Sequence, residues 1–130
     1  MKAEEKTGKK VLIIDDEESI SLSLLFHFQD CGYEAAAVDS AEAGLQEMER
    51  NTPEAVIVDL RLPGMNGIDF IRTATAKFPG VKYVIFTGSP ENSVPDDMPG
   101  TGPVSDRIFY KPLENLTELS DHVKQLIQTG

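Results

Sequence analysis

Three short apolar runs constrain the fold of this chain more than any other feature of its sequence. They occupy residues 11–14, 55–58 and 84–86, and each is followed by a polar residue: Asp15, Asp59 or Thr87. The runs are rich in β-branched residues and show no alternation of polar and apolar positions, which is typical of strands buried on both faces. The sequence therefore predicts a parallel sheet covered on two sides, with weaker strand candidates at 33–38 and 107–110.

The segments between these runs carry apolar residues at helical spacing. We expect Ser40 to cap the second helix, and Asn115 and Glu118 to act as a capping pair for the last one. Strands that alternate with helices predict the α/β class, with right-handed crossovers, five strands and four regular helices. The apolar stripes are Ile20, Leu24, Leu25 and Phe28; Ala41, Leu45 and Met48; Phe70, Ile71, Ala74 and Phe78; and Leu116, Leu119, Val123, Leu126 and Ile127.

One segment between the fourth and fifth strands does not fit the helical pattern. Residues 89–106 read SPENSVPDDMPGTGPVSD and hold four prolines and two glycines. Proline inside a helix costs about 3 kcal/mol, because it lacks a backbone donor and clashes with the preceding turn. We therefore expect the fourth of the usual five helices to be short or irregular.

Length and composition indicate a single domain. We expect residues 1–9, which are charged and lack periodicity, to form a tail, and residues 10–128 to form the domain. The single cysteine, Cys31, cannot form an intramolecular disulfide, which fits a reducing cytoplasm. No apolar run is long enough for a membrane span or a signal core, so we expect a cytoplasmic protein without membrane association. A formal net charge of -10 disfavours direct binding to nucleic acid.

Polar residues at the strand ends predict a functional site. In an open parallel sheet, ligands bind outside the carboxyl ends of the strands. Asp15, Asp16 and Glu17 follow the first predicted strand, and Asp59 follows the third. Thr87 ends the fourth, and Lys111 follows the fifth. Although they lie far apart in the sequence, these residues are expected to meet at one edge of the sheet.

The proximity of three carboxylates suggests a bound cation. Two like charges about 4 Å apart repel by roughly 4 kcal/mol at an effective dielectric constant near 20. Oxygen ligands without His or Cys favour Mg²⁺ over zinc. Phosphoryl transfer needs a nucleophile, a cation and donors for the remaining charge. Asp59, Mg²⁺, the Thr87 hydroxyl and the Lys111 ammonium would supply these parts.

Four motifs give the chain a family resemblance. VLIIDDEES, VDLRLPGMNG, FTGS and YKP, in this order and spacing, resemble the response-regulator receiver domains of two-component signalling. The resemblance runs from Lys10 to about Gln128. It implies a flavodoxin-like, doubly wound sheet of strand order 2-1-3-4-5 with helices on both faces. It also implies a phosphohistidine donor, on a histidine kinase or a histidine phosphotransfer protein.

The resemblance also implies a role for each site residue. Asp59 would be the phosphoacceptor, and Thr87 and Lys111 would contact the phosphoryl group as catalytic residues. The metal site would be formed by Asp15, Asp16, Asp59 and the backbone carbonyl of Arg61, with Asp16 as the direct carboxylate ligand and Asp15 acting through bound water. The bond between Lys111 and Pro112 would be cis. In such a role the chain is not an enzyme, since it catalyses only its own phosphorylation and slow dephosphorylation.

The sequence departs from the family pattern at one switch position and leaves other readings open. Receiver domains usually have Tyr or Phe three residues before the lysine, whereas this chain has Ile108. An aspartate-nucleophile phosphatase would need an acid at the position of Arg61. A flavodoxin-like electron carrier would need a phosphate loop where the acidic residues 15–17 stand. A phosphorylation assay would distinguish a phosphorylatable receiver domain from a pseudo-receiver that only binds partners.

Overall fold

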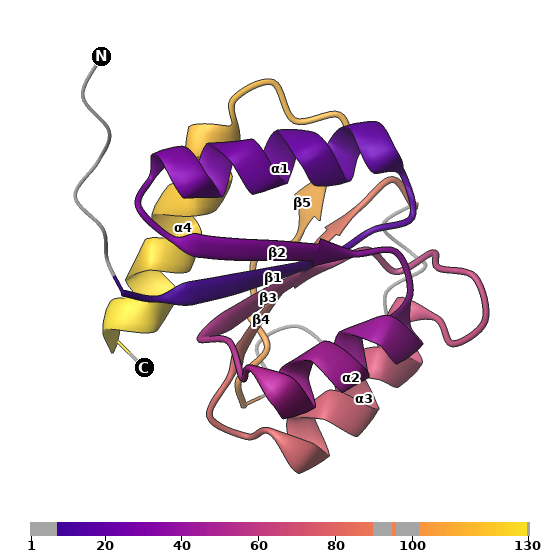
Figure 1. Cartoon of the computed structure of the whole chain (residues 1–130). Helices are drawn as coiled ribbons and strands as arrows, with labels where there is room; N and C mark the ends of the chain where they lie inside the picture. The colour runs from indigo at the N-terminus through magenta and orange to yellow at the C-terminus, as the bar shows by residue number, and fades with distance from the viewer. Residues whose placement is uncertain (1–7, 90–94, 96–101, 130) are drawn as a thin grey trace.

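Five parallel strands form one sheet in the order β2-β1-β3-β4-β5 in the computed structural model, which describes residues 8–89, 95 and 102–129 (Figure 1). This is the strand order implied by the receiver-domain resemblance. The strands are β1 (Lys10–Ile14), β2 (Glu34–Val38), β3 (Ala55–Val58), β4 (Lys82–Thr87) and β5 (Phe109–Tyr110). The helices are α1 (Glu18–Asp30), α2 (Ala41–Arg50), α3 (Gly67–Lys77) and α4 (Leu116–Thr129).

Helices cover both faces of the sheet, so the predicted α/β class is confirmed. Helices α1 and α4 lie on one face, and α2 and α3 lie on the other (Figure 1). Successive residues of a strand point to opposite faces. In β1, Leu12 packs into the core under α2 and α3, whereas Ile13 packs into the core under α1 and α4. The uninterrupted apolar runs therefore reflect two hydrophobic cores that share the same central strands.

The sequence predicted N-terminal caps for two helices, α2 and α4. Ser40 caps α2, because its Oγ accepts a hydrogen bond from Ala43 N at 3.1 Å. At α4, Asn115 Oδ1 accepts a hydrogen bond from Thr117 N at 3.0 Å, so Asn115 acts as a cap. The Glu118 carboxylate forms an ion pair with Arg107 at 3.0 Å, before β5.

The last strand is shorter than the sequence predicted. Residues 107–110 were expected to form it, but only Phe109 and Tyr110 pair with β4. Val104 forms an isolated parallel bridge with Tyr83, after which the chain leaves the sheet. Arg107 N donates to Ser105 Oγ at 3.0 Å, so a local turn takes the place of ladder pairing.

Two further expectations concern the predicted fourth helix and the peptide bond between Lys111 and Pro112. The predicted short or irregular fourth helix lies mostly within residues 90–94 and 96–101, outside the described residues. The Lys111–Pro112 peptide bond is cis, as the family resemblance implied. Within the described ranges, no helix has both the length and the apolar composition that crossing a bilayer requires.

Candidate functional site

The four polar strand ends meet at one edge of the sheet, as predicted. Strand β1 pairs with β3 so that Ile14 lies opposite Val58, which places Asp15 and Asp59 on neighbouring strand ends. Asp59 N donates to Ile14 O at 3.0 Å, and Lys111 N donates to Thr87 O at 2.9 Å. Backbone hydrogen bonds of the parallel sheet thus extend to Asp59 and Lys111 and fix the position of their backbones.

The Asp59 carboxylate is buried and held by donors from three parts of the chain. Its Oδ1 accepts hydrogen bonds from Thr87 Oγ1 at 2.7 Å and from Arg61 N at 3.2 Å. Its Oδ2 accepts one from Lys111 Nζ at 3.0 Å. A buried carboxylate needs such partners, because burying an unpaired charge is costly. The arrangement fixes the orientation of both Asp59 oxygens.

Lys111 lies at the centre of the acidic group. Its Nζ is 2.7 Å from Asp15 Oδ2, 2.7 Å from Glu17 Oε1 and 3.0 Å from Asp59 Oδ2. Burial lowers the pKa of Lys111, but its hydrogen bonds to these three carboxylates outweigh burial, so the pKa is raised overall. The ammonium therefore stays charged and neutralises part of the acidic group.

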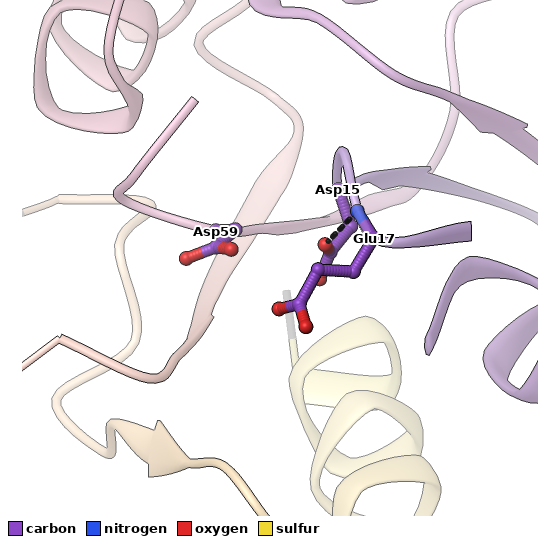
Figure 2. A group of neighbouring side chains, drawn as sticks. All are labelled: Asp15, Glu17 and Asp59. Carbon is purple, nitrogen blue, oxygen red and sulfur yellow. Dashed lines mark hydrogen bonds between the residues drawn. The ribbon is translucent and has the colours of Figure 1, made fainter. Parts of the chain in front are cut away.

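The turn from β1 into α1 presents two of the carboxylates (Figure 2). Asp15 Oδ1 accepts a hydrogen bond from Glu17 N at 2.9 Å, and Asp15 O accepts one from Ser21 Oγ at 3.0 Å. Burial raises the pKa of Asp15, although its bonds to Lys111 and to Glu17 N act in the opposite direction. Burial thus disfavours the ionised form of Asp15.

The acidic group has the donor chemistry of a site for a hard cation. One carboxylate oxygen from each of Asp15, Glu17 and Asp59 lies within 4.8 Å of the others. All three donors are oxygens, which fits Mg²⁺ and does not fit a nitrogen- or sulfur-preferring metal. Figure 2 shows Asp15 and Glu17 in the β1–α1 turn and Asp59 at the end of β3. This group can therefore hold a divalent cation.

Asp16, predicted to be the direct metal ligand, lies outside this group of three. It is exposed, and it lines an open pocket of about 300 Å³ together with Glu17, Asp59 and Arg61. The predicted residues Asp16 and Arg61 thus lie on the rim of the pocket that contains Asp59.

The sequence placed Glu17 at the predicted sheet edge without a ligand or catalytic role, and its contact with Lys111 makes it a member of the cluster. Its position two residues after Asp15 was the available signal, but its 58% exposed side chain could have pointed elsewhere. Ser89 was also missed: its backbone N donates to Thr87 Oγ1 at 3.1 Å and helps to orient that hydroxyl. The contact of Glu17 with Lys111 spans 94 positions and depends on tertiary packing, whereas the contact of Ser89 with Thr87 spans two positions and is local.

Known proteins resemble this chain in sequence over nearly its whole length. The sensory transduction protein RegX3 of Mycolicibacterium smegmatis is 32% identical over 120 residues, which cover 92% of this chain and 51% of that protein. The transcriptional regulatory protein PrrA of Mycobacterium tuberculosis is 32% identical over 123 residues, covering 94% of this chain and 51% of that protein. The chain therefore spans about half the length of these curated relatives.

Solved structures share the fold. A response regulator receiver domain protein from Clostridium thermocellum has a TM-score of 0.82 at 25% identity, covering 93% of this chain and 95% of that one. TrrA from Thermotoga maritima, solved in complex with Mg²⁺ and BeF, has a TM-score of 0.78 at 26% identity, covering 91% and 98%. The sequence model described as "Response regulator receiver domain" matches residues 11–124. With its strand order and its acidic edge, this chain belongs to the response regulator receiver domain family.

Proposed function

We propose that this receiver domain accepts a phosphoryl group on Asp59 as one step of a two-component phosphorelay. The observation that supports this most directly is the environment of the Asp59 carboxylate. It lies at the end of the central strand β3 and accepts bonds from Thr87, Lys111 and Arg61 N. Phosphoryl transfer depends mainly on positioning and on donors for the transferred charge, and these groups are already in place.

The reaction is a displacement at phosphorus. A carboxylate oxygen of Asp59 forms a bond to phosphorus while the bond from phosphorus to the imidazole nitrogen of a phosphohistidine breaks. The imidazole leaves with the electron pair and takes up a proton. The product is an acyl phosphate on Asp59. Thr87 Oγ1 and Lys111 Nζ, which donate to Asp59 before transfer, are then close enough to donate to the phosphoryl oxygens.

Mg²⁺ is the cofactor that this proposal includes. Asp15, Asp16, Asp59 and the backbone carbonyl of Arg61 would hold it, and it would supply positive charge to the phosphoryl oxygens. The oxygen-only acidic group and the pocket beside Asp59 support this assignment. In this role the chain is not a turnover enzyme, because it alters only its own covalent state.

The donor in this proposal is a phosphohistidine on a histidine kinase or a histidine phosphotransfer protein, acting in the cytoplasm. Helix α1 begins beside the site and exposes two large apolar side chains, Leu22 (42%) and Phe26 (57%). They are four residues apart, so they share one face of the helix. Such a face suits a protein partner. The net charge of -10 argues against a nucleic acid as the domain's own ligand.

The output of the domain is proposed to differ from the usual receiver pattern. Ile108 is half-buried and packs against the core under α2 and α3. A β-branched side chain is stiff at its first torsion and has no ring to swing behind Thr87. We therefore expect phosphorylation to change the conformation little at Ile108.

Phosphorylation with a small-molecule donor tests the proposal. Incubation with acetyl phosphate and Mg²⁺ should add one phosphoryl group to the wild type, and Asp59→Asn should abolish the addition. Asp39→Asn is a matched control, because Asp39 directly follows β2 as Asp59 follows β3, and it is exposed. Intact-mass spectrometry and peptide mapping would measure the addition and its position.

The same assay decides between the remaining interpretations. No labelling of a folded wild type would favour a pseudo-receiver that only binds partners. Labelling that persists in Asp59→Asn would place the phosphoacceptor elsewhere. Continuous release of phosphate from unrelated phosphomonoesters would favour the phosphatase reading.

A further inference from the structure

The loop that joins β3 to α3 carries one of the proposed metal ligands. It runs from Asp59 to Asn66 and includes Arg61, whose backbone N donates to Asp59 Oδ1 at 3.2 Å. Near its start, Leu60 and Leu62 are buried in the hydrophobic core. Leu60 O also accepts a hydrogen bond from Gly67 N at 2.9 Å, which closes the base of the loop.

The tip of this loop is exposed and is held from another helix. Pro63 and Gly64 are exposed, and Gly64 has a φ of 72°, in the left-handed region that favours glycine. Met65 N donates to Glu42 Oε2 at 3.0 Å. Glu42 lies in the first turn of α2, so this bond ties the loop tip to a different element.

The Glu42 carboxylate also lies against the turn itself. A Cβ added at Gly64 would lie 2.9 Å from Glu42 Oε2, which shows how close the two groups are. Hydrogen bonds from its own backbone N–H and from Met65 N lower the pKa of Glu42, so it is ionised at neutral pH. A hydrogen bond to a charged acceptor is stronger than a neutral one. The contact is thus suited to restraining an otherwise exposed turn.

We propose that Glu42 is a positioning residue of the phosphorylation site, which holds the β3–α3 loop through Met65 so that the Arg61 backbone stays beside Asp59. The inference rests on the proposed function, because it assumes that the Arg61 carbonyl is a metal ligand. Glu42 itself touches neither Asp59 nor the pocket residues. Its effect should therefore appear in the affinity for Mg²⁺ and not in the chemical step.

Three variants test this inference. Glu42→Ala removes the acceptor, Glu42→Gln keeps an acceptor oxygen without the charge, and Glu49→Ala is the matched control. Glu49 lies on the same helix, and its carboxylate makes an exposed ion pair with Lys77 at 2.7 Å, away from the loop. Hydrogen exchange of the Met65 amide, Mg²⁺ affinity by calorimetry, and the rate of phosphorylation by acetyl phosphate over a range of Mg²⁺ would be measured.

We expect Glu42→Ala to speed exchange at Met65 and to weaken Mg²⁺ binding by about threefold to tenfold, as for the loss of one hydrogen bond. At saturating Mg²⁺ its phosphorylation rate should stay within about twofold of the wild type, since the reacting groups are unchanged. Glu42→Gln should restore most of the affinity, and Glu49→Ala should match the wild type.

Several outcomes overturn the inference. Unchanged Mg²⁺ affinity despite faster exchange at Met65 would show that the loop tip does not influence the site. Equal losses in Glu49→Ala would indicate a general effect on α2, and a lower rate at saturating Mg²⁺ would indicate a role in chemistry. Failure of the proposed function would be seen separately, as absence of labelling at Asp59 in the wild type. Exchange and Mg²⁺ binding would still test Glu42 in that case.

Discussion

Lys111 serves as the internal counter-ion of the candidate site. Its ammonium contacts Asp15, Glu17 and Asp59, two of which are buried. Removing one member of a buried ion-paired group leaves uncompensated charge, which costs more than the pair itself contributes. The same three carboxylates also form the group able to hold a cation. A divalent ion bound to this group would therefore neutralise the same charges as Lys111.

Substitution of Lys111 separates the stabilisation by its ammonium group from the stabilisation by a bound divalent ion. Lys111→Met keeps an apolar stem but removes the charge, so the metal-free variant should lose about 2–4 kcal/mol of unfolding free energy. Mg²⁺ should stabilise this variant more than the wild type, because the ion replaces the missing charge. Urea denaturation with and without Mg²⁺ would measure both effects.

Lys77→Met provides the control for that experiment. Lys77 forms an exposed ion pair with Glu49, so its loss should cost less than about 0.5 kcal/mol and should not respond to Mg²⁺. If Lys111→Met is no less stable than Lys77→Met in the absence of metal, Lys111 is not a structural counter-ion.

At the scale of elements, the start of α3 determines how closely the helix approaches the site. A Cβ at Gly67, the first residue of α3, would lie 2.3 Å from Asp59 O and 2.6 Å from Leu60 Cα. Both are backbone atoms just after the end of β3, so moving them would displace Asp59. The absence of a side chain at this position lets helix and strand end meet.

Gly67→Ala should therefore affect both stability and chemistry. Forcing an extra methyl group into a tightly packed position costs about 1–3 kcal/mol, and here it should also slow phosphorylation by shifting Asp59. Gly80→Ala is the matched control, since a Cβ there meets nothing within 4 Å. Thermal unfolding and the acetyl phosphate assay would test both variants. If Gly67→Ala matches the wild type in thermal stability and phosphorylation rate, the backbone after β3 can move to accommodate the methyl group.

At the scale of the whole molecule, the excess of acidic residues makes stability sensitive to cations. The chain has 22 Asp and Glu against 12 Lys and Arg. Part of the repulsion among these acidic residues is spread over the surface and is screened by any salt. The acidic group at the strand ends is local, and a bound divalent ion should act on it specifically.

Mg²⁺ should therefore raise the melting temperature beyond the effect of ionic strength. At ten times the dissociation constant, binding stabilises by about 1.4 kcal/mol, which corresponds to roughly 4–7 °C for a domain of this size. Asp16→Asn should reduce the increase, because Asp16 is a proposed ligand of the ion. Differential scanning calorimetry in MgCl₂ and in NaCl of equal ionic strength would measure it. Equal shifts in the two salts would count against a specific site.

The sequence by itself determined most of the fold and the main residues of the site. Continuous apolar runs are typical of strands buried on both faces, and the predicted strands and helices are present, with β5 shorter than expected. Because parallel strands end at one edge, the polar residues after them were predicted to meet. Thr87 and Lys111 both donate hydrogen bonds to the Asp59 carboxylate there.

The tertiary structure alone decided which neighbours complete the site. Glu17 and Lys111 are 94 positions apart, and Glu42 and Met65 are 23 apart. These contacts depend on the side-chain conformations and loop paths of separate elements. Neither hydrophobic periodicity nor position at a strand end predicts such contacts. The shortness of β5 accompanies a local turn, in which Arg107 N donates a hydrogen bond to Ser105 Oγ. Local patterns place residues on elements, whereas contacts between exposed side chains and loops arise only when the elements pack.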